Sequence, residues 1–383
     1  MPEAQAAPAS LADRVRALAG ALGFDRAGIA RLDTPLPHAD RFRDWLARGR
    51  HGEMAWLARN PEERLDPLRR FPWARSAVVV SLVYDTPREA PERAPAQDRA
   101  PGRRPAGEAA GSSPPSAGIA RYARGRDYHD ILLPPLRALG DALEPLAGRA
   151  VQSRAYVDTG PLLERALAAR AGLGWIGRNT LVIDPALGSY LFLGVLLCDL
   201  DLPGDPLEPD HCGSCRACLD ACPTGAFPEP YVLDASRCLS YTTIELRSAI
   251  PEPLRAGQGD WVFGCDACQE VCPWNTRTRR TVPPDRAGLR AALAPRAEWV
   301  RPALAWLLAL DEEAWRVSTR RGALRRAKHR GLLRNALVAA GNAGDPALAS
   351  LVARHAASPD PLIAEHARWA LARLQPQAGR APS

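Results

Sequence analysis

The sequence has little that would place it in a membrane or outside the cell. No apolar run reaches the roughly 18 to 20 residues that a membrane-spanning helix needs. The N-terminus has no basic segment followed by an apolar core, as a secretory signal would. We therefore expect a cytoplasmic protein with no membrane partner. Aromatic residues are also scarce, at 6%, but 383 residues of which 46% are hydrophobic can bury a large core and exceed one ordinary domain.

Lysine is nearly absent, since Lys328 stands alone against 49 arginines. The formal net charge of +7 would suit a polyanionic partner, because cationic side chains neutralise phosphates. A chain rich in Arg, Ala and Pro is also what a GC-rich genome produces. Bulk basicity is therefore weak evidence, and only local clustering of charge counts.

Nine cysteines in a chain expected to stay in a reducing compartment indicate metal ligation rather than disulfides. Four of them form the run C-x-x-C-x-x-C-x-x-x-C-P of bacterial ferredoxins, and a second run also ends in Cys-Pro. In such modules the last cysteine of each run ligates the other cluster. We assign Cys212, Cys215, Cys218 and Cys272 to one 4Fe-4S cluster, and Cys222, Cys238, Cys265 and Cys268 to the other.

Zinc is the alternative for paired C-x-x-C motifs, but two runs that each end in Cys-Pro fit zinc poorly. Cys198, at the end of an apolar strand, is interpreted as a small buried hydrophobe. A ferredoxin module moves single electrons, so the chain is either a redox enzyme or an electron-transfer subunit. An enzyme needs a cofactor site and a proton donor, whereas a carrier needs neither.

Helical and strand patterns alternate before the cysteines, which predicts an α/β domain. A helix with Ser10 as its N-cap precedes a strand at 25–30, and residues 76–84 form a β-branched strand whose end is a candidate ligand edge. Further strands are expected to end at Val157 and to cover 190–197. The stretch 86–117 is a mixture of Pro, Ala, Arg and Gly that cannot bury a core, so we expect a disordered surface insert.

The C-terminal region alternates apolar helical faces with short breaks, which predicts HEAT-type helical repeats. Residues 316–334 hold eight Lys or Arg and no acid. The alternative to a binding function is a solvated helix face. We interpret the following residues as a phosphate-binding strip for RNA: Arg320, Arg321, Arg325, Arg326, Lys328, His329 and Arg330.

Several segments resemble those of epoxyqueuosine reductases, the cobalamin-dependent enzymes that complete the queuosine modification of tRNA. They extend over most of the chain and include GRDYHDILLPPL, VDTGPLLERALAARAGLGWIGRNTLVI, GSYLFLG, RCLSYTTIELR, GCDACQEVCPWN and RNALVAAGN. The resemblance implies a monomer built from an α/β (α+β) cobalamin-binding domain, an inserted double-cluster ferredoxin-like domain and a C-terminal α-helical HEAT-like repeat domain that binds tRNA. The expected ranges are 1–200, 201–284 and 285–376.

The implied reaction removes the epoxide oxygen of epoxyqueuosine in the anticodon, consuming two electrons and two protons. Electrons would pass singly from the two 4Fe-4S clusters to cobalamin, supplied by an unidentified low-potential donor. An epoxide oxygen leaves readily only when it is protonated. Asp158, on a D-T-G turn, matches the aspartate taken as proton donor in the family. The alternative is that Asp158 caps the following helix.

Cobalamin itself is implied only by the resemblance. The motif D-x-H-x-x-G is absent, because Leu132 stands where the glycine after His129 would be, so a histidine is not expected as the lower axial ligand. Arg178 stands where a lysine is common, and the insert is longer than the family needs. The residues implied to hold cobalamin are Arg64, Ala120, Asp158, Asn179, Thr180, Val182, Ser240 and Asp266.

A corrinoid reductive dehalogenase would share the cobalamin and ferredoxin modules. Such enzymes are exported behind a twin-arginine signal, whereas Arg69 and Arg70 are internal and precede no long apolar segment. A cobalamin-handling chaperone or a ferredoxin-type electron carrier would explain neither Asp158 nor the basic strip. The sequence therefore favours the tRNA-modifying enzyme.

Overall fold

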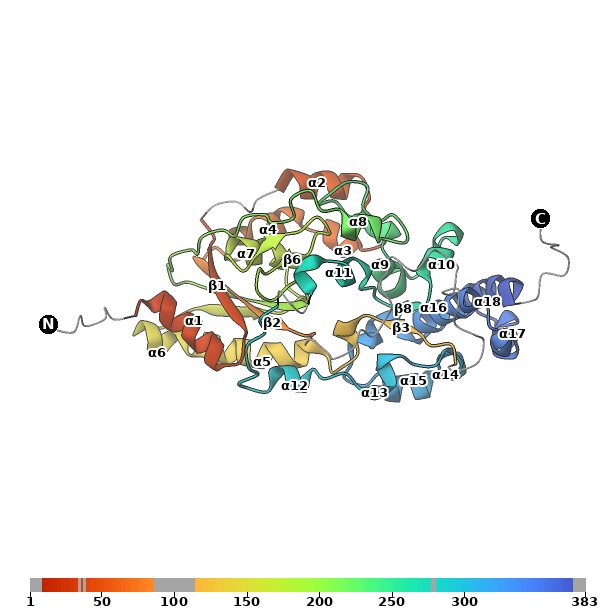
Figure 1. Ribbon diagram of the computed structural model, residues 1–383. Helices are drawn as coiled ribbons and strands as arrows, with labels where there is room; N and C mark the ends of the chain where they lie inside the picture. Colours follow the sequence, from red (N-terminus) through yellow and green to blue (C-terminus); the bar gives the residue numbers. More distant parts are fainter. Residues whose placement is uncertain (1–8, 34–35, 37–38, 86–113, 277–279, 375–383) are drawn as a thin grey trace.

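The computed structural model describes residues 9–33, 36, 39–85, 114–276 and 280–374 (Figure 1). Its N-terminal half is organised by a four-stranded sheet of order β1-β2-β7-β4. Every neighbouring pair of these strands is antiparallel. The strands are β1 (Arg26–Arg31), β2 (Ser76–Val83), β7 (Leu191–Cys198) and β4 (Ser153–Tyr156).

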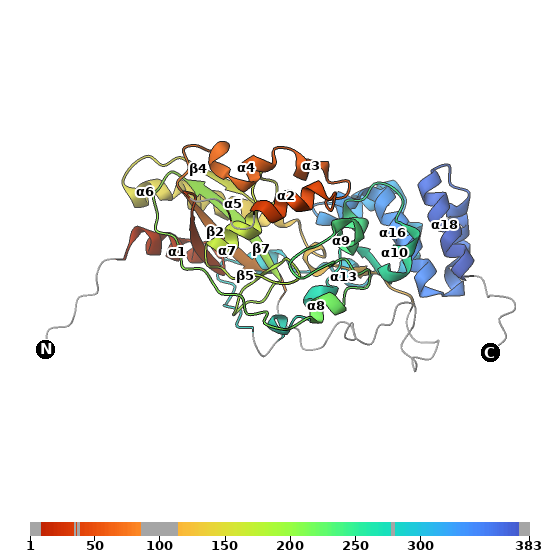
Figure 2. The ribbon, with the colours of Figure 1, turned by 90° about the horizontal axis from the view of Figure 1, so that it is seen from above.

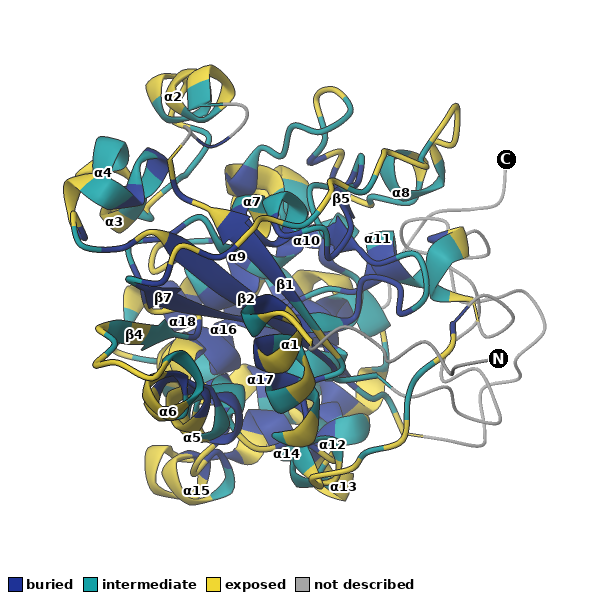
Figure 3. Ribbon diagram, turned by 90° about the vertical axis from the view of Figure 1, so that its left-hand side faces the viewer, coloured by how far each residue is buried: buried dark blue, intermediate teal, exposed yellow. Residues whose placement is uncertain are grey.

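Helices cover both faces of this sheet, which is why all eight residues of β2 are buried (Figure 3). Val78, Val80 and Leu82 pack against α1 (Leu11–Ala21) and α5 (Tyr128–Asp141). Ala77 and Val79 face the opposite side, against α7 (Glu164–Arg170). Alternate residues of a strand point to opposite faces. A strand that is covered on both sides therefore has an unbroken apolar run in its sequence.

Of the two forms in the expected α/β (α+β) class, the structure shows α+β, because every strand pair of this sheet is antiparallel. Continuous apolar runs are typical of parallel strands, but here an antiparallel sheet has acquired the same pattern through double-sided burial. The ligand-edge rule for parallel sheets therefore does not apply to the end of β2. The N-terminal expectation is confirmed, because the Ser10 side chain accepts a hydrogen bond from the Asp13 amide at the start of α1.

The expected disordered insert is too long at its C-terminal end. Residues 86–113 lie outside the described residues, but Ser116 forms a β-bridge with Ala303, and Ala117 is fully buried. The chain then enters β3 (Gly118–Ile119), which pairs in parallel with β8 (Trp261–Phe263). The composition of residues 114–117 predicted disorder, but contacts with residues nearly 190 positions away along the chain hold this segment in place.

Short elements carry the cysteine region. Its helices lie between the sheet and the C-terminal helices in Figure 1. They are α8 (Ala217–Asp220), α9 (Leu239–Ile244), α10 (Glu252–Gln258) and α11 (Ala267–Glu270). The remaining N-terminal elements are α2 (Ala39–Ala47), α3 (Ala55–Ala58), α4 (Pro61–Leu65), α6 (Leu143–Ala147), β5 (Trp175–Ile176) and β6 (Val182–Ile183).

The C-terminal region is helical throughout its described part, and α18 lies at the opposite end of the molecule from α1 (Figure 2). Its core is built round α16, which packs against α14 and α18. The helices are α12 (Leu289–Ala292), α13 (Ala297–Val300), α14 (Leu304–Ala309), α15 (Glu312–Ser318), α16 (Lys328–Ala343), α17 (Ala349–Ala356) and α18 (Pro361–Leu374). Leu289 and Leu293 pack instead with the core of α1 and α5. In the part of the chain that the structure describes, no helix is long and apolar enough to cross a membrane.

Two polar side chains of α16 fasten the helical region to the cysteine region. Arg334 is 1% exposed and donates hydrogen bonds to the backbone oxygens of Thr242, Leu246 and Ser248, over 2.6 to 2.9 Å. The neighbouring Asn335 donates to two further backbone oxygens of the cysteine region. These segments form few backbone hydrogen bonds to neighbouring strands. The side chains of α16 therefore supply the hydrogen bonds that their carbonyls need.

We expect Arg334→Met to destabilise the protein by about 3 kcal/mol, because two buried carbonyls and one half-buried carbonyl would be deprived of their donor. The melting temperature should fall by about 5 °C or more. The matched control is Arg354→Met, since Arg354 is exposed on α17. Thermal unfolding followed by circular dichroism would measure both. Equal melting temperatures for the two variants would show that the buried guanidinium is dispensable.

Candidate functional site

The eight cysteines expected to be ligands have free thiols, which the fold gathers into two sets. Burial and the charges of Cys272, Cys212 and Cys215 together raise the pKa of Cys218 to about 11. These four thiols are therefore neighbours, although Cys272 is more than 50 residues away along the chain. This set is the one assigned to the first cluster from the spacing.

The second set forms round Cys268. Burial raises the pKa of its thiol well above the ordinary value, and so do the charges of Cys238, Cys222 and Cys218. The same holds for Cys265, which has Cys268 and Cys238 as its charged neighbours. Because Cys218 belongs to the first set, the two sets are adjacent. Closely placed buried thiols with raised pKa values fit a group that binds thiolates and offsets their repulsion.

Aromatic rings enclose the first set. The Trp175 indole donates a hydrogen bond of 3.4 Å to the Cys212 sulfur, and Trp274 lies edge-on to Trp175. Among the described residues, no group of three or more His, Cys, Asp or Glu side chains is gathered as it would be round a single metal ion. Cys198 lies fully buried in β7, away from both sets, as expected of a small hydrophobe.

Asp158 lies on a tight turn directly after β4. Its φ of 59° is in the left-handed region, and its side chain is 66% exposed. The alternative that it caps the next helix is wrong, because α7 begins only at Glu164 and has Leu163 at its N-cap, with no side-chain hydrogen bond. The carboxylate is therefore free of a capping role and open to solvent.

His129 lies between two carboxylates. Its Nδ1 is 2.7 Å from Asp127 Oδ1, and its Nε2 is 3.6 Å from Asp158 Oδ2. At 3.6 Å the second contact is an ion pair rather than a hydrogen bond. Burial alone would lower the pKa of His129, but Asp127 and Asp158 outweigh it and raise the pKa to about 9. His129 in turn holds the pKa of Asp158 below its ordinary value.

The sequence pattern raises His129 only as a possible axial ligand and does not predict this pairing. One signal was available, because Asp127 precedes a helical pattern as an N-cap would, and it does cap α5. A histidine two residues after an N-cap aspartate can reach the same carboxylate. The contact with Asp158 has no sequence signal, since it joins residues 29 positions apart.

The basic strip, which belongs to the C-terminal region, lies close to Asp158. Arg326, in the 3-10 helix Ala323–Ala327, is among the charges that lower the pKa of Asp158. The Asp127 amide also donates a hydrogen bond of 2.8 Å to the backbone oxygen of Arg321. The strip and the candidate acid therefore share one region of the structure.

The seven residues of the strip divide into two groups. Arg326 forms a two-bond ion pair with Glu245, Arg330 pairs with Asp360, and His329 Nε2 lies 2.9 Å from the Leu310 carbonyl oxygen. The other four are exposed and form no ion pair with a described residue. These four free cations are Arg320, Arg321, Arg325 and Lys328.

Unpartnered buried polar atoms occur among the residues implied to hold cobalamin. Arg64 Nε and Asn179 Nδ2 are buried with no hydrogen-bond partner. Thr180, next in the chain, has a φ of 64°, and its carbonyl accepts a hydrogen bond from Arg165. Buried polar atoms are seldom left unpaired, so this group fits a bound molecule that carries amide or other polar substituents.

The other implied cobalamin residues lie on the cysteine side. Asp266 is 1% exposed, burial raises its pKa to about 6, and it accepts a hydrogen bond from the Arg121 amide. Ala120 precedes Arg121 and is buried, Val182 is buried in β6, and Ser240 is in α9.

Tyr122 lies between the acid and the cysteines. Burial raises the pKa of its hydroxyl, and the charges of Asp158 and Asp266 raise it further. Its ring packs against Tyr128 on one side and Phe263 on the other, with centroids 6.3 and 6.2 Å apart. Tyr122 is therefore close to both the candidate acid and Asp266, which directly follows Cys265.

Two thiol sets, an exposed acid backed by a protonated imidazole and a strip of free cations define an iron-sulfur redox protein that acts on an anionic substrate. Comparison with known proteins makes this specific. Residues 211–275 match the family described as a 4Fe-4S double cluster binding domain, and residues 64–159 match "Epoxyqueuosine reductase QueG, DUF1730".

Whole-chain similarities agree with these matches. Epoxyqueuosine reductase of Pseudomonas aeruginosa is 40% identical over 369 residues, covering 96% of this chain and 95% of the relative. A crystal structure of epoxyqueuosine reductase with an epoxyqueuosine-modified tRNA-Tyr stem loop is similar with a TM-score of 0.80 and 29% identity, over 94% of this chain and 89% of that one. The chain belongs to the epoxyqueuosine reductase family.

A third similar protein of known structure comes from the same family. It is the epoxyqueuosine reductase of Bacillus subtilis with an aspartate-bearing catalytic loop swung out of the active site, at a TM-score of 0.78 and 28% identity over 94% of this chain and 89% of that one.

We expect Cys218→Ser to remove most of one cluster, because Cys218 is central to the first thiol set. Iron should fall from about eight toward four per chain, with a matching decrease in acid-labile sulfide. The control is Cys198→Ala, which should keep all the iron, since Cys198 belongs to neither set. Anaerobic purification followed by iron and sulfide analysis would measure this. Full iron in Cys218→Ser would contradict the assignment.

Proposed function

We propose that this protein reduces epoxyqueuosine to queuosine at the wobble position of tRNA, the last step of queuosine biosynthesis. The observation that carries the proposal is the meeting of three features in one region: the exposed Asp158, the basic residue Arg326 beside it, and the thiol sets beyond Tyr122. A proton, an RNA backbone and electrons can all be brought there. The similarity to a reductase crystallised with an epoxyqueuosine tRNA stem loop supports the same substrate.

The cofactors in this proposal are two 4Fe-4S clusters and cobalamin. The two thiol sets would hold the clusters. The bound cobalamin would supply a low-valent metal centre that accepts single electrons from the clusters and delivers two to the substrate. The unpartnered polar atoms of Arg64 and Asn179 support their role in holding it. The proposed contacts are Arg64, Ala120, Asp158, Asn179, Thr180, Val182, Ser240 and Asp266.

We propose that Asp158 hands a proton to the epoxide oxygen and that His129 holds the proton beforehand. Asp158 alone would be ionised at neutral pH, because its pKa lies below the ordinary value. His129 has a pKa of about 9 and is therefore protonated. Its Nε2 lies 3.6 Å from the carboxylate, a gap that a small side-chain movement can close. Each turnover takes two protons and two electrons and releases the oxygen as water.

The domain roles follow from the same proposal. Residues 1–200 would form the cobalamin-binding domain, residues 201–284 the ferredoxin-like domain, and residues 285–376 a HEAT-like domain that binds tRNA. Arg320, Arg321, Arg325 and Lys328 would contact phosphates, because no described carboxylate competes for them. Arg326, His329 and Arg330 would have to leave present partners to do so. The protein would act as a cytoplasmic monomer with a separate low-potential electron donor.

We expect Asp158→Asn to lower the rate on epoxyqueuosine-containing tRNA by about 100-fold or more, because it removes the group that transfers the proton. Iron and cobalamin contents should not change. The control is Asp130→Asn, since Asp130 is an exposed acid in the first turn of α5. Single-turnover assays with a strong reductant under anaerobic conditions would measure both rates. A rate near that of the wild type in Asp158→Asn would reject the acid role.

The pH dependence of the rate tests His129. A raised pKa means that the proton is present at neutral pH and is lost as pH rises through about 9, so the wild-type rate should fall there. Asp127→Asn removes one carboxylate and should move that fall to lower pH. In His129→Asn, the range below about pH 9 over which the rate is high and constant should be absent. Identical pH profiles for the wild type and His129→Asn would show that the proton comes from another group.

A further inference from the structure

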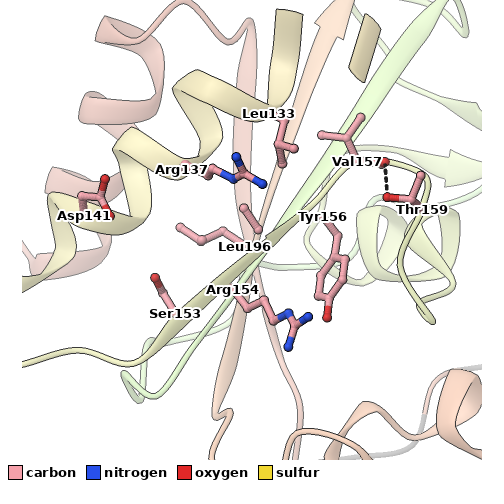
Figure 4. Close-up of a pocket in the computed structure, with 10 residues that line it drawn as sticks. Leu133, Arg137, Asp141, Ser153, Arg154, Tyr156, Val157, Thr159 and Leu196 are labelled. Carbon is pink, nitrogen blue, oxygen red and sulfur yellow. Dashed lines mark hydrogen bonds between the residues drawn. The ribbon is translucent and has the colours of Figure 1, made fainter. Parts of the chain in front are cut away.

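A polar hollow lies beside the acid, between α5 and β4 (Figure 4). Its volume is about 400 Å³, within the range of small-ligand pockets. Leu133, Arg137 and Asp141 line it from α5, and their spacing of four residues places them on one face of that helix. The hollow therefore runs along the helix and the neighbouring strand, as a groove.

One end of the groove lies at the candidate acid. Val157 and Thr159, which line it, are the residues on either side of Asp158. The groove follows β4 away from this turn, and β4 is the last strand of its sheet, paired only with β7. A molecule bound at Asp158 could therefore continue into the groove without displacing a strand.

Two arginines give the groove its charge. Arg137 and Arg154 are exposed, and neither forms an ion pair with a carboxylate of the described residues. The guanidinium carbon of Arg154 lies 5.5 Å from the centroid of the Tyr156 ring, so a flat aromatic surface helps to orient it. In Figure 4 the Arg137 guanidinium extends toward the end with Val157 and Thr159, the Arg154 guanidinium lies beside the Tyr156 ring, and Asp141 lies at the opposite end.

The rest of the lining is mixed. Leu133, Ala155, Val157 and Leu196 are apolar and Tyr156 is aromatic, whereas Ser153, Thr159 and Asp141 are polar. Free guanidinium groups beside an apolar and aromatic surface are the combination that binds single-stranded nucleic acid, since the phosphate is anionic and every base has a flat face.

The groove also continues the surface that carries the basic strip. The start of α5 is joined to the strip by the hydrogen bond from the Asp127 amide to the Arg321 carbonyl. In Figure 3, α5, β4 and α15, which precedes the strip, lie toward the same side of the molecule. An RNA strand that crosses Asp158 would therefore have free cations on both sides of it.

We propose that the groove binds a nucleotide of the anticodon loop that is adjacent to the wobble nucleotide, with Arg137 and Arg154 on its phosphate and the Tyr156 side of the groove receiving its base. This inference rests on the proposed function and adds a specificity site to it. Holding the neighbouring nucleotide would keep the loop open while the wobble base is turned toward Asp158. Charge favours RNA over an extended peptide on the open edge of β4.

The first experiment reverses both charges, in Arg137→Glu/Arg154→Glu, in protein loaded with clusters and cobalamin. We expect KM for epoxyqueuosine-containing tRNA to rise about tenfold or more, with kcat within about twofold. The slope of log affinity against log salt should shrink by about 0.7 for each phosphate that the variant no longer neutralises. The matched control is Arg14→Glu, an exposed arginine of α1, which should leave KM and the slope near wild type.

The second experiment locates the nucleotide. Stem loops with an abasic site on either side of the wobble position are compared in binding to the wild type and to Tyr156→Ala. One abasic position should weaken wild-type binding by about tenfold but should have little further effect in Tyr156→Ala, because the two changes remove the same interaction. Fully additive effects at both positions would overturn the placement of the base.

The outcomes separate this inference from the proposed function. Turnover by the wild type, with unchanged KM and salt slope in the charge-reversed variant, would reject the groove and leave the function standing. If the wild type neither binds nor converts the modified tRNA, the proposed function fails and the inference fails with it. Stem-loop binding that depends on Arg137 and Arg154 would support the groove independently of turnover.

Discussion

The structure depends on the buried polar contacts by which α16 holds the cysteine region. Arg334 and Asn335 donate to backbone oxygens between Thr242 and Val262, and α16 is also the centre of the C-terminal core. A region built from short helices and thiol ligands has little apolar surface of its own to bury. Its position is therefore set by hydrogen bonds to a neighbouring helix, which fixes the cysteines and the C-terminal helices relative to each other.

This attachment decides where the basic residues lie. The strip extends into the first turn of α16, so a helix fixed on the cysteine region brings Arg326 to Glu245 and close to Asp158. Arg247 strengthens the junction, since its guanidinium donates to the backbone oxygens of Arg326 and Ala327. The same contacts therefore serve stability and place the cations beside the acid.

The acid is governed by opposing charges. Two carboxylates raise the pKa of His129 to about 9, and the cations His129 and Arg326 keep Asp158 ionised. At neutral pH the protonated His129 holds the proton and Asp158 is ionised. In the proposed reaction the pair supplies the proton, because the imidazole that holds it lies beside the exposed carboxylate.

Much of this protein was determined by the sequence itself. The cysteine spacing specified both sets of thiols, including the exchange of Cys222 and Cys272, since ligand spacing is a local property of the chain. The β-branched run at 76–84 predicted a strand, and the sequence around Asp158 indicated the turn. The resemblance to epoxyqueuosine reductases over most of the chain indicated the family.

Only the tertiary structure decided the rest, because it depends on contacts between distant residues. Strand direction could not be read from β2, since burial on both faces hides the difference between parallel and antiparallel sheets. The order of residues 114–117, the pairing of His129 with Asp158, and the division of the basic strip into paired and free cations all arise from neighbours far along the chain. Local sequence determines which chemical groups are present, and packing determines which of them meet.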